Sequence, residues 1–253
     1  MSEWNWGRPD ELSRLMDEAW LGLARCDKLE PVAAAAPYSR DQLGALGVTG
    51  IEFAAWKTAH PEGLGSDLVS LRTDDATTEA GHIWRVDGEC YFVALDICRP
   101  LPFADGSVDW VYAEHLIEHV TLDDGITWLT EVRRILAPGG LLRLTTPDLA
   151  TYVDSYTTGS AFFDRHRKRL HAAGLGPPMP ARRAFMFNQI FYLYGHRWLY
   201  DLDELRYALG EAGFDPDTVR RASFRKGARP DVADLDRILR KEESMYIEAT
   251  PLP

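Results

Sequence analysis

The 253-residue sequence predicts a single α/β domain built around a mostly parallel sheet. Short apolar segments alternate with amphipathic segments, as they do in repeated strand–helix–strand units. With 45% hydrophobic and 26% charged residues, a chain of this length buries one large core and still carries a cap. We divide it into an N-terminal helical extension or lid, residues 1–40, and a main domain, residues 41–253.

An amphipathic helix is expected at the start, where apolar residues recur at helical spacing from Leu12 to Leu23 behind a capping Asp10. The alanine-rich stretch from Pro31 to Pro37 then forms a connector. The expected strands lie near residues 50–54, 66–69, 91–95, 108–112, 141–145 and 245–249.

Two helices have clear boundaries in the sequence. The first spans about residues 121–136, with apolar residues on one face, and Pro138-Gly139-Gly140 ends it. The second begins at Asp201, where Asp201 and Glu204 have the spacing of a capping box, and it ends at Gly213.

The segment from about residue 150 to residue 199 fits no simple strand–helix step. It is rich in aromatic residues and broken between Gly174 and Pro180, which predicts an inserted helical cap. A cap above the carboxyl ends of the strands is where a substrate pocket forms in an open α/β fold.

Charge and cysteine content narrow the classes of partner. The formal net charge of -11 disfavours nucleic acid, and we interpret the basic run from Arg165 to Arg169 as the solvated face of a helix. Three cysteines with no C-x-x-C spacing and no secretory leader indicate a reduced, cytoplasmic compartment. No apolar run is long enough to cross a membrane.

Two stretches carry a family resemblance. The first runs from Leu95 to His119 and includes Leu101-Pro102-Phe103-Ala104-Asp105-Gly106-Ser107-Val108-Asp109; the second runs from Glu131 to Asp148 through Ala137-Pro138-Gly139-Gly140. Together they resemble the middle of class I S-adenosylmethionine-dependent methyltransferases of the type 11 kind. Gly195 to Asp201 and Ala212-Gly213-Phe214 are similar to the C-terminal part of that group, so the resemblance covers most of residues 48–250.

The resemblance implies a Rossmann-like class I methyltransferase sheet with helices on both faces, and S-adenosylmethionine as cofactor. A donor with an adenosine part needs a carboxylate at one strand end for the ribose hydroxyls, and a polar side chain at the next for the adenine amine. Asp67 and Asp96 fit these two roles. The other expected cofactor-binding residues are Glu52, Ala54, Trp56, Ile97, Glu114 and His115.

The turn after the first strand departs from the family pattern. Glu52 stands in place of the family's acidic residue, but Ala54, Trp56 and Thr58 occupy positions where glycines are expected. Either the loop runs differently, with Gly63-Leu64-Gly65 relieving the crowding, or donor binding is weakened or lost. The alternative function is therefore a catalytically inactive methyltransferase-like binding or assembly protein.

Methyl transfer needs alignment of donor and acceptor, and a general base when the acceptor is a hydroxyl or an amine. His196 is the first candidate base because it follows the cap segment; the alternative is that it fastens the cap to the sheet. His115, directly after the fourth strand, is the second. Glu118 and His119 are expected to be structural or to orient the loop. Weaker candidates for acceptor contacts are Asn188, Arg197 and Tyr200.

The run from His115 to His119 also matches the H-x-x-E-H arrangement of inverted zinc peptidases. Five residues match easily by chance, the flanking segments explain them as a strand-to-helix junction, and the sequence marks no third ligand. We therefore expect no zinc-peptidase site and assign no metal ligands; a divalent metal that assists an acceptor hydroxyl is an open alternative without support in the sequence. A methyl group is expected to pass to an oxygen, nitrogen or carbon atom of a small-molecule acceptor, such as a sugar or secondary metabolite. A protein acceptor would need an open acidic groove. The first helix leaves a homodimer open.

Overall fold

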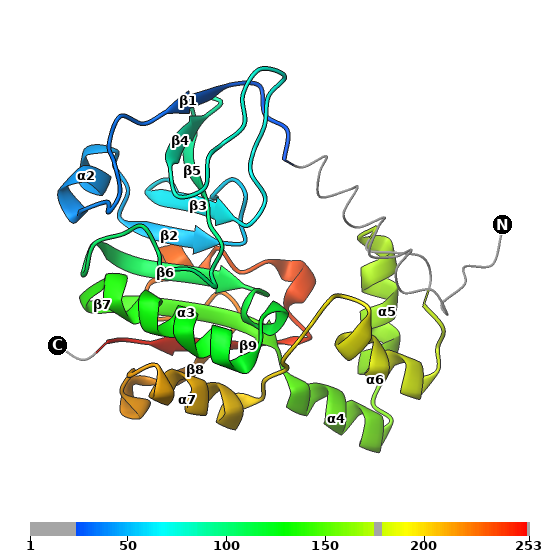
Figure 1. Cartoon of the computed structure of the whole chain (residues 1–253). Coiled ribbons are helices and arrows are strands. Elements are labelled where there is room, and N and C mark those ends of the chain that lie inside the picture. Colours follow the sequence, from blue (N-terminus) through cyan, green and yellow to red (C-terminus); the bar gives the residue numbers. More distant parts are fainter. Residues whose placement is uncertain (1–23, 175–178, 252–253) are drawn as a thin grey trace.

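A mixed nine-stranded sheet forms the centre of the fold (Figure 1). The computed structural model describes residues 24–174 and 179–251, so the helix expected within residues 1–23 lies outside the described residues. The strand order is β1-β4-β5-β3-β2-β6-β7-β9-β8. Among the described residues, no helix has both the length and the apolar character that a bilayer crossing requires.

Five central strands run parallel to one another, and at each edge two further strands are added through antiparallel pairings. The parallel strands are β2 (Gly50–Phe53), β3 (Gly63–Asp67), β5 (Cys90–Ala94), β6 (Val108–Glu114) and β7 (Leu136–Pro147). The antiparallel strands are β1 (Leu29–Pro31), β4 (Ile83–Val86), β8 (Arg220–Ala222) and β9 (Ser244–Ala249).

The six expected strands are confirmed, with bounds that differ by a few residues. The largest difference is in β7, which begins at Leu136, directly after the helix α3 (Leu122–Ile135), so that Pro138 and Gly140 lie within the bounds of the strand. The helix therefore ends before Pro138-Gly139-Gly140, as the sequence predicted. The pairing of β6 with β7 accommodates this start through a register shift between Val108 and Trp110.

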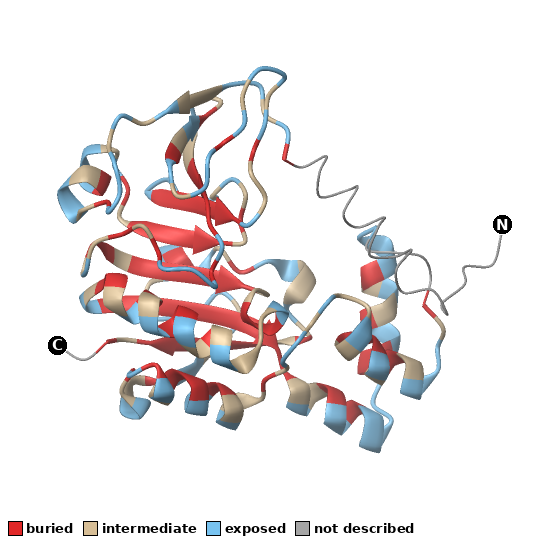
Figure 2. Ribbon diagram, in the orientation of Figure 1, coloured by how far each residue is buried: buried red, intermediate tan, exposed pale blue. Residues whose placement is uncertain are grey.

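One face of the sheet is covered by α2 (Arg40–Ala45), α3 (Leu122–Ile135) and α7 (Leu202–Glu211), whose apolar side chains join the main core cluster. Figure 2 shows the buried strands and the half-buried helices around them. The predicted cap of α7 is confirmed, because Asp201 accepts from the backbone N–H of Glu204 at 2.9 Å. The Glu204 carboxylate accepts from the indole of Trp198 instead of completing a capping box.

The opposite face is covered by short elements. No helix separates β2 from β3; the connection is the loop of residues 54–62, and a Cβ added at Gly65 would lie 2.7 Å from the carbonyl oxygen of Trp56. The short α8 (Pro230–Ala233) places Val232 against Trp110 and Leu141. Three single turns complete the connections, η1 (Ile117–His119), η2 (Pro216–Thr218) and η3 (Ile238–Arg240).

The described part of the expected N-terminal extension, residues 24–40, packs with the main domain. β1 pairs with β4 at the sheet edge, and Tyr38 is fully buried in the main core cluster. The apolar and aromatic residues of this stretch are too dispersed for a periodic signal, so the sequence did not predict β1. The strand with which it pairs, β4, was not predicted either.

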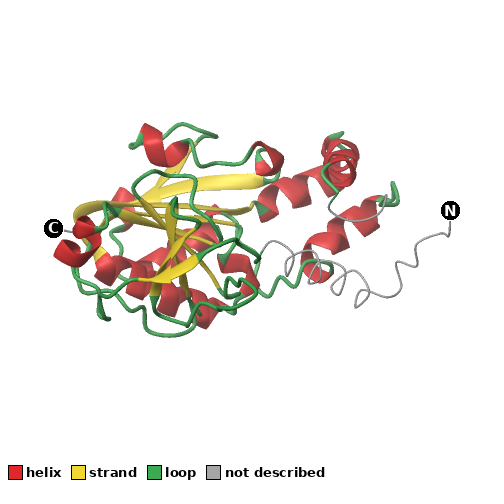
Figure 3. Cartoon of the chain, turned by 90° about the horizontal axis from the view of Figure 1, so that it is seen from above, coloured by secondary structure: helices red, strands yellow, loops and turns green. Residues whose placement is uncertain are grey.

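The cap expected near residues 150–199 is present as α4 (Leu149–Thr158), α5 (Phe162–Ala172) and α6 (Arg183–Tyr192). These helices have an apolar cluster of their own and lie beyond the carboxyl ends of the parallel strands (Figures 1 and 3). Tyr152 of α4 donates to the carboxylate of Glu243 at 2.9 Å and lies 3.1 Å from His166 of α5, which ties the cap to the start of β9.

Candidate active site

The strand order reverses at β2, because β3 and β5 lie on one side of it and β6 and β7 on the other. The ladders pair Phe53 with Ser66 on one side and with Ala113 on the other. The next residue of each strand is Ala54, Asp67 and Glu114, so these three meet at one level of the carboxyl edge. Open α/β sheets bind ligands at such a switch point.

Three buried carboxylates line this edge. Glu52 accepts from the Thr58 hydroxyl at 2.8 Å and from the backbone N–H of Ala59 at 3.1 Å. Asp67 accepts from the N–H of Val69 at 3.2 Å. Glu114 accepts from the backbone N–H of Arg237 at 3.0 Å, and its other oxygen lies 3.2 Å from that guanidinium. Burial raises the pKa of all three.

The loop after β2 keeps a glycine-like path although it has no glycine at these positions. Ala54 has φ 54° and Trp56 has φ 53°, in the left-handed region that costs a side-chain-bearing residue about 1–2 kcal/mol. The Trp56 side chain packs against an apolar cluster that includes Leu71 and Phe92. The backbone of this loop thus adopts, at Ala54 and Trp56, the left-handed conformation that glycines were expected to provide.

The residues expected beside the adenine follow β5. Asp96 is exposed, accepts from the backbone N–H of Cys98 at 3.0 Å and lies 3.7 Å from the Arg99 guanidinium. Ile97 is buried in the main core cluster. Both lie at the same edge of the sheet as Asp67, which pairs with Ala94.

His115 directly follows β6 and contacts two polar side chains. Its Nε2 lies 2.6 Å from the hydroxyl of Ser244, and its Nδ1 lies 3.2 Å from Oε1 of Glu118. The Ser244 hydroxyl has a second acceptor 2.8 Å away in the carbonyl oxygen of Arg240. The backbone of His115 has φ 52°, so the surrounding contacts hold it in a strained conformation that points the imidazole at these partners.

The other expected base, His196, joins a different group. Its ring centroid lies 4.8 Å from that of His119, and ligand atoms of Glu118, His119 and His196 all lie within 4.8 Å of one another. Nδ1 of His196 donates to the carbonyl oxygen of Ile190 at 2.5 Å. Burial lowers the pKa of His196 to about 4, which makes it a weak base at neutral pH.

Glu118 connects the two groups. It is fully buried, and its Oε2 accepts from the Thr146 hydroxyl at 3.0 Å. Burial opposes ionisation, but the adjacent His115 outweighs it and holds the pKa of Glu118 at about 2. The segment Ile117–His119 is a single 3₁₀ turn, so His115 and His119 do not share a helix face as the zinc-peptidase arrangement requires.

The expected acceptor contacts are dispersed. Asn188 is exposed on α6 and its amide donates to Ala184 of the same helix. The side chain of Arg197 is exposed, while its backbone N–H donates to the Glu118 carbonyl at 2.7 Å. Tyr200 is fully buried in the main core cluster, and burial raises its pKa. Of these three residues, Arg197 has a backbone hydrogen bond to the histidine group.

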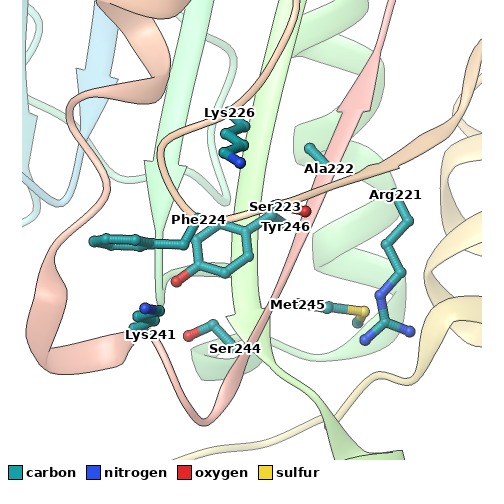
Figure 4. A pocket seen from close by; sticks show the side chains of 9 residues that line it. All are labelled: Arg221, Ala222, Ser223, Phe224, Lys226, Lys241, Ser244, Met245 and Tyr246. Carbon is teal, nitrogen blue, oxygen red and sulfur yellow. The ribbon is translucent and has the colours of Figure 1, made fainter.

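A pocket of about 410 Å³ opens between β8, the loop that follows it and the start of β9 (Figure 4). One of its lining residues, Ser244, contacts the His115 imidazole. Sequence reasoning missed this pocket because its walls come from irregular segments without a motif. Its lining combines three cations with aromatic and hydroxyl groups: Arg221, Lys226, Lys241, Phe224, Tyr246, Ser223 and Ser244.

The wall of this pocket is fixed by a buried ion network. Arg143 of β7 donates to Asp236 at 2.9 Å and 2.6 Å and to Glu248 at 2.7 Å. It also donates to the carbonyl oxygens of Ser223 and Lys226, which hold the loop after β8 against the sheet.

Residues 46–144 match a family profile described as a methyltransferase domain. Over this segment the chain resembles methyltransferase domains. The matched segment spans β2 through most of β7, which includes every strand whose carboxyl end forms the edge described above.

The solved structures that this chain resembles are distant from it in sequence. The CurJ carbon methyltransferase is 16% identical, with 82% of this chain and 49% of that chain covered and a TM-score of 0.45. An S-adenosylmethionine-dependent methyltransferase from Mesorhizobium loti is 16% identical, with 84% and 98% covered and a TM-score of 0.43. The chain thus spans about half the length of the CurJ chain. No curated protein sequence gave a significant match.

The residues of the carboxyl edge have the chemistry that S-adenosylmethionine, if bound there, would require. Asp67 is a buried carboxylate at a strand end, as hydrogen-bonding to ribose hydroxyls requires. Glu52 and Glu114 add two further acidic groups that suit a cationic sulfonium, and Arg237 offsets part of their charge. The left-handed Ala54 lets the loop turn away directly after β2.

Proposed function

We propose that this chain transfers a methyl group from S-adenosylmethionine to a small organic acceptor that carries an anionic group. The observation that supports this proposal best is the cationic pocket beside His115, since Ser244 both lines the pocket and contacts that imidazole. A volume of about 410 Å³ suits a small molecule, because ligand pockets usually measure about 300–1,000 Å³.

The charge of the pocket contrasts with that of the whole chain, which is -11. Arg221 is paired with Asp148 at 2.6 Å. Within residues 24–174 and 179–251, no carboxylate forms an ion pair with Lys226 or Lys241, and the Lys241 ammonium lies 5.3 Å from the Phe224 ring centroid. Two cations without a carboxylate partner, beside aromatic rings, favour an acceptor with a carboxylate or phosphate and an apolar body. A nucleic-acid acceptor is disfavoured by the net charge.

Within this proposal, Asp67 would hold the ribose hydroxyls of the donor, and Asp96 would take the adenine amine. The backbone at Ala54 and the carboxylates of Glu52 and Glu114 would lie along the methionine part. When bound, S-adenosylmethionine supplies a methyl group whose transfer to a nucleophile leaves S-adenosylhomocysteine.

His115 is the base that this proposal uses for a hydroxyl or amine acceptor. The Glu118 carboxylate fixes the Nδ1 side of the imidazole, so that Nε2 faces the pocket side. The Ser244 hydroxyl can turn to the Arg240 carbonyl, which frees Nε2 to accept a proton from the acceptor. His196 would then support the fold of this region, because its lowered pKa makes it a weaker base.

The proposal is tested with tritiated-methyl S-adenosylmethionine and a panel of small aromatic alcohols and amines. Each acceptor is offered in matched forms that carry a carboxylate, a phosphate, a neutral amide or an amine. We expect a carboxylate or phosphate form to be methylated with a kcat/KM about 10–100-fold above its amide analogue, as one or two charge-assisted hydrogen bonds provide.

Variants identify the pocket as the source of that preference. In Lys226→Gln/Lys241→Gln the preference for the anionic acceptor should disappear. The matched control is Lys168→Gln, an exposed lysine of α5, which should keep it. Equal transfer to neutral or amine-bearing acceptors in the native protein, or a preference that persists in the double variant, would contradict the proposal.

A further inference from the structure

The strongest feature outside the proposed transfer site is the group formed by Glu118, His119 and His196. Two of its members follow β6, and the third comes from the connection between the cap and α7. Their ligand atoms all lie within 4.8 Å of one another. The sequence offered no third ligand for the His115–His119 motif, and the fold brings His196 to it.

We propose that Glu118, His119 and His196 bind a divalent transition-metal ion. Two imidazoles and one carboxylate form a set that catalytic zinc and related ions use, with coordination positions left open. Magnesium and calcium prefer oxygen ligands, so two imidazoles disfavour them. This proposal does not depend on methyl transfer.

Each of two ligands already has an outer partner that orients it. Nδ1 of His196 donates to the Ile190 carbonyl, which leaves Nε2 as the ligand atom. The Glu118 carboxylate is held by the Thr146 hydroxyl and contacts His115. Because each carboxylate oxygen has more than one lone pair, these contacts leave acceptor capacity for an ion.

The site is also accessible. Glu118 is buried, whereas the two imidazoles are partly open to the surface. Ligand atoms on one tetrahedral ion are about 3.3 Å apart, given metal–ligand bonds of about 2.0–2.2 Å. Binding would therefore draw the three side chains together slightly, by rotation of imidazoles that lie on a single 3₁₀ turn and in a connecting segment.

A nearby cation does not forbid this binding. Burial is the main cause of the lowered pKa of His119, and the Arg240 guanidinium adds a smaller effect, but that guanidinium is paired with Glu243 at 3.1 Å. The carboxylates of Glu118 and Glu243 together balance much of the added charge.

The test is direct metal binding by the full chain without donor or acceptor. After chelator treatment and dialysis, Co²⁺ is titrated while its visible absorption is followed, and Zn²⁺ is used to displace it. We expect one ion per chain with the intense bands of a four- or five-coordinate site. His119→Gln and His196→Gln should each weaken Co²⁺ affinity at least about 100-fold, since loss of an outer partner alone costs about 10–100-fold.

The control is His82→Gln/His171→Gln, which removes two exposed histidines outside the group and should bind as the native protein does. Thermal unfolding of every variant without metal shows that it is folded. The absence of binding in the native protein, unchanged affinity in both group variants, or loss of binding in the control would overturn the proposal. A native protein that binds Co²⁺ but no S-adenosylmethionine would leave the metal site standing and remove the proposed transfer function.

Discussion

Nδ1 of His115 lies 3.2 Å from Oε1 of the fully buried Glu118. This contact fixes the imidazole of His115, which directly follows β6 at the carboxyl edge of the sheet. It also links that edge to the pocket, because the opposite nitrogen of the same ring contacts Ser244. In the proposed reaction, a single side chain would therefore couple the orientation of the base to the location of the acceptor.

The first prediction concerns His115 itself. His115→Gln should lower kcat by at least about 100-fold, as expected when a general base is removed, and leave the affinity for S-adenosylmethionine within a few-fold. Steady-state kinetics with an acceptor from the panel, together with calorimetry of the donor, measure both quantities. A loss of less than about threefold in kcat would show that another group takes the proton.

A second prediction concerns the loop after β2. Because Ala54 has φ 54°, Ala54→Gly should raise the free energy of unfolding by up to about 1 kcal/mol. Its buried neighbour Ala55 lacks a positive φ, so Ala55→Gly should lower that free energy by about 1 kcal/mol. Urea unfolding compares the two. Equal destabilisation by both changes would mean that the loop stores no strain at Ala54.

The third prediction concerns the wall of the pocket. Asp236→Ala removes a partner of Arg143 while that guanidinium stays buried, so it should cost about 3–5 kcal/mol of stability. The control is Asp74→Ala, which breaks the exposed pair with Arg25 and should change stability by less than about 1 kcal/mol. Chemical denaturation gives both free energies of unfolding. If Asp236→Ala lowered stability as little as Asp74→Ala does, the claim that the buried ion network stabilises the pocket wall would be contradicted.

Stability should also depend on pH through His196. Its pKa falls from 6.5 in the unfolded chain to about 4 in the folded protein, because of burial. Between these values the unfolded chain binds a proton that the folded protein does not, so stability should fall as the pH falls through that window. In metal-free buffer, His196→Asn should flatten this dependence in part, whereas His82→Asn should not. An unchanged slope in His196→Asn would contradict the assignment.

The sequence predicted most of the sheet because the parallel strands are short apolar runs bounded by turn residues. It also predicted the cap at residues 150–199 and the N-cap at Asp201 from composition and spacing. It did not predict β1 and β4, which are short and only partly apolar. Nor did it predict that a loop would replace the helix between β2 and β3, because the left-handed residues Ala54 and Trp56 carry no glycine signal.

The candidate site could be predicted where it depends on strand ends. Asp67 and Glu114 meet at the carboxyl edge because the parallel register brings them there. The groups that depend on long-range packing could not be predicted. His196 and Ser244 reach the histidines after β6 only through the cap connection and the last hairpin, and no local spacing records that approach.

Donor binding at the carboxyl edge is the central claim, and calorimetry with S-adenosylmethionine on the native chain, Asp67→Asn and Asp75→Asn tests it most directly. Asp75 is an exposed aspartate a few residues beyond β3 and serves as the matched control. We predict binding by the native chain, the same affinity in Asp75→Asn, and about 10–100-fold weaker binding in Asp67→Asn, as expected for lost hydrogen bonds to a charged group. No heat with the native chain, or equal affinity in Asp67→Asn, would contradict the account.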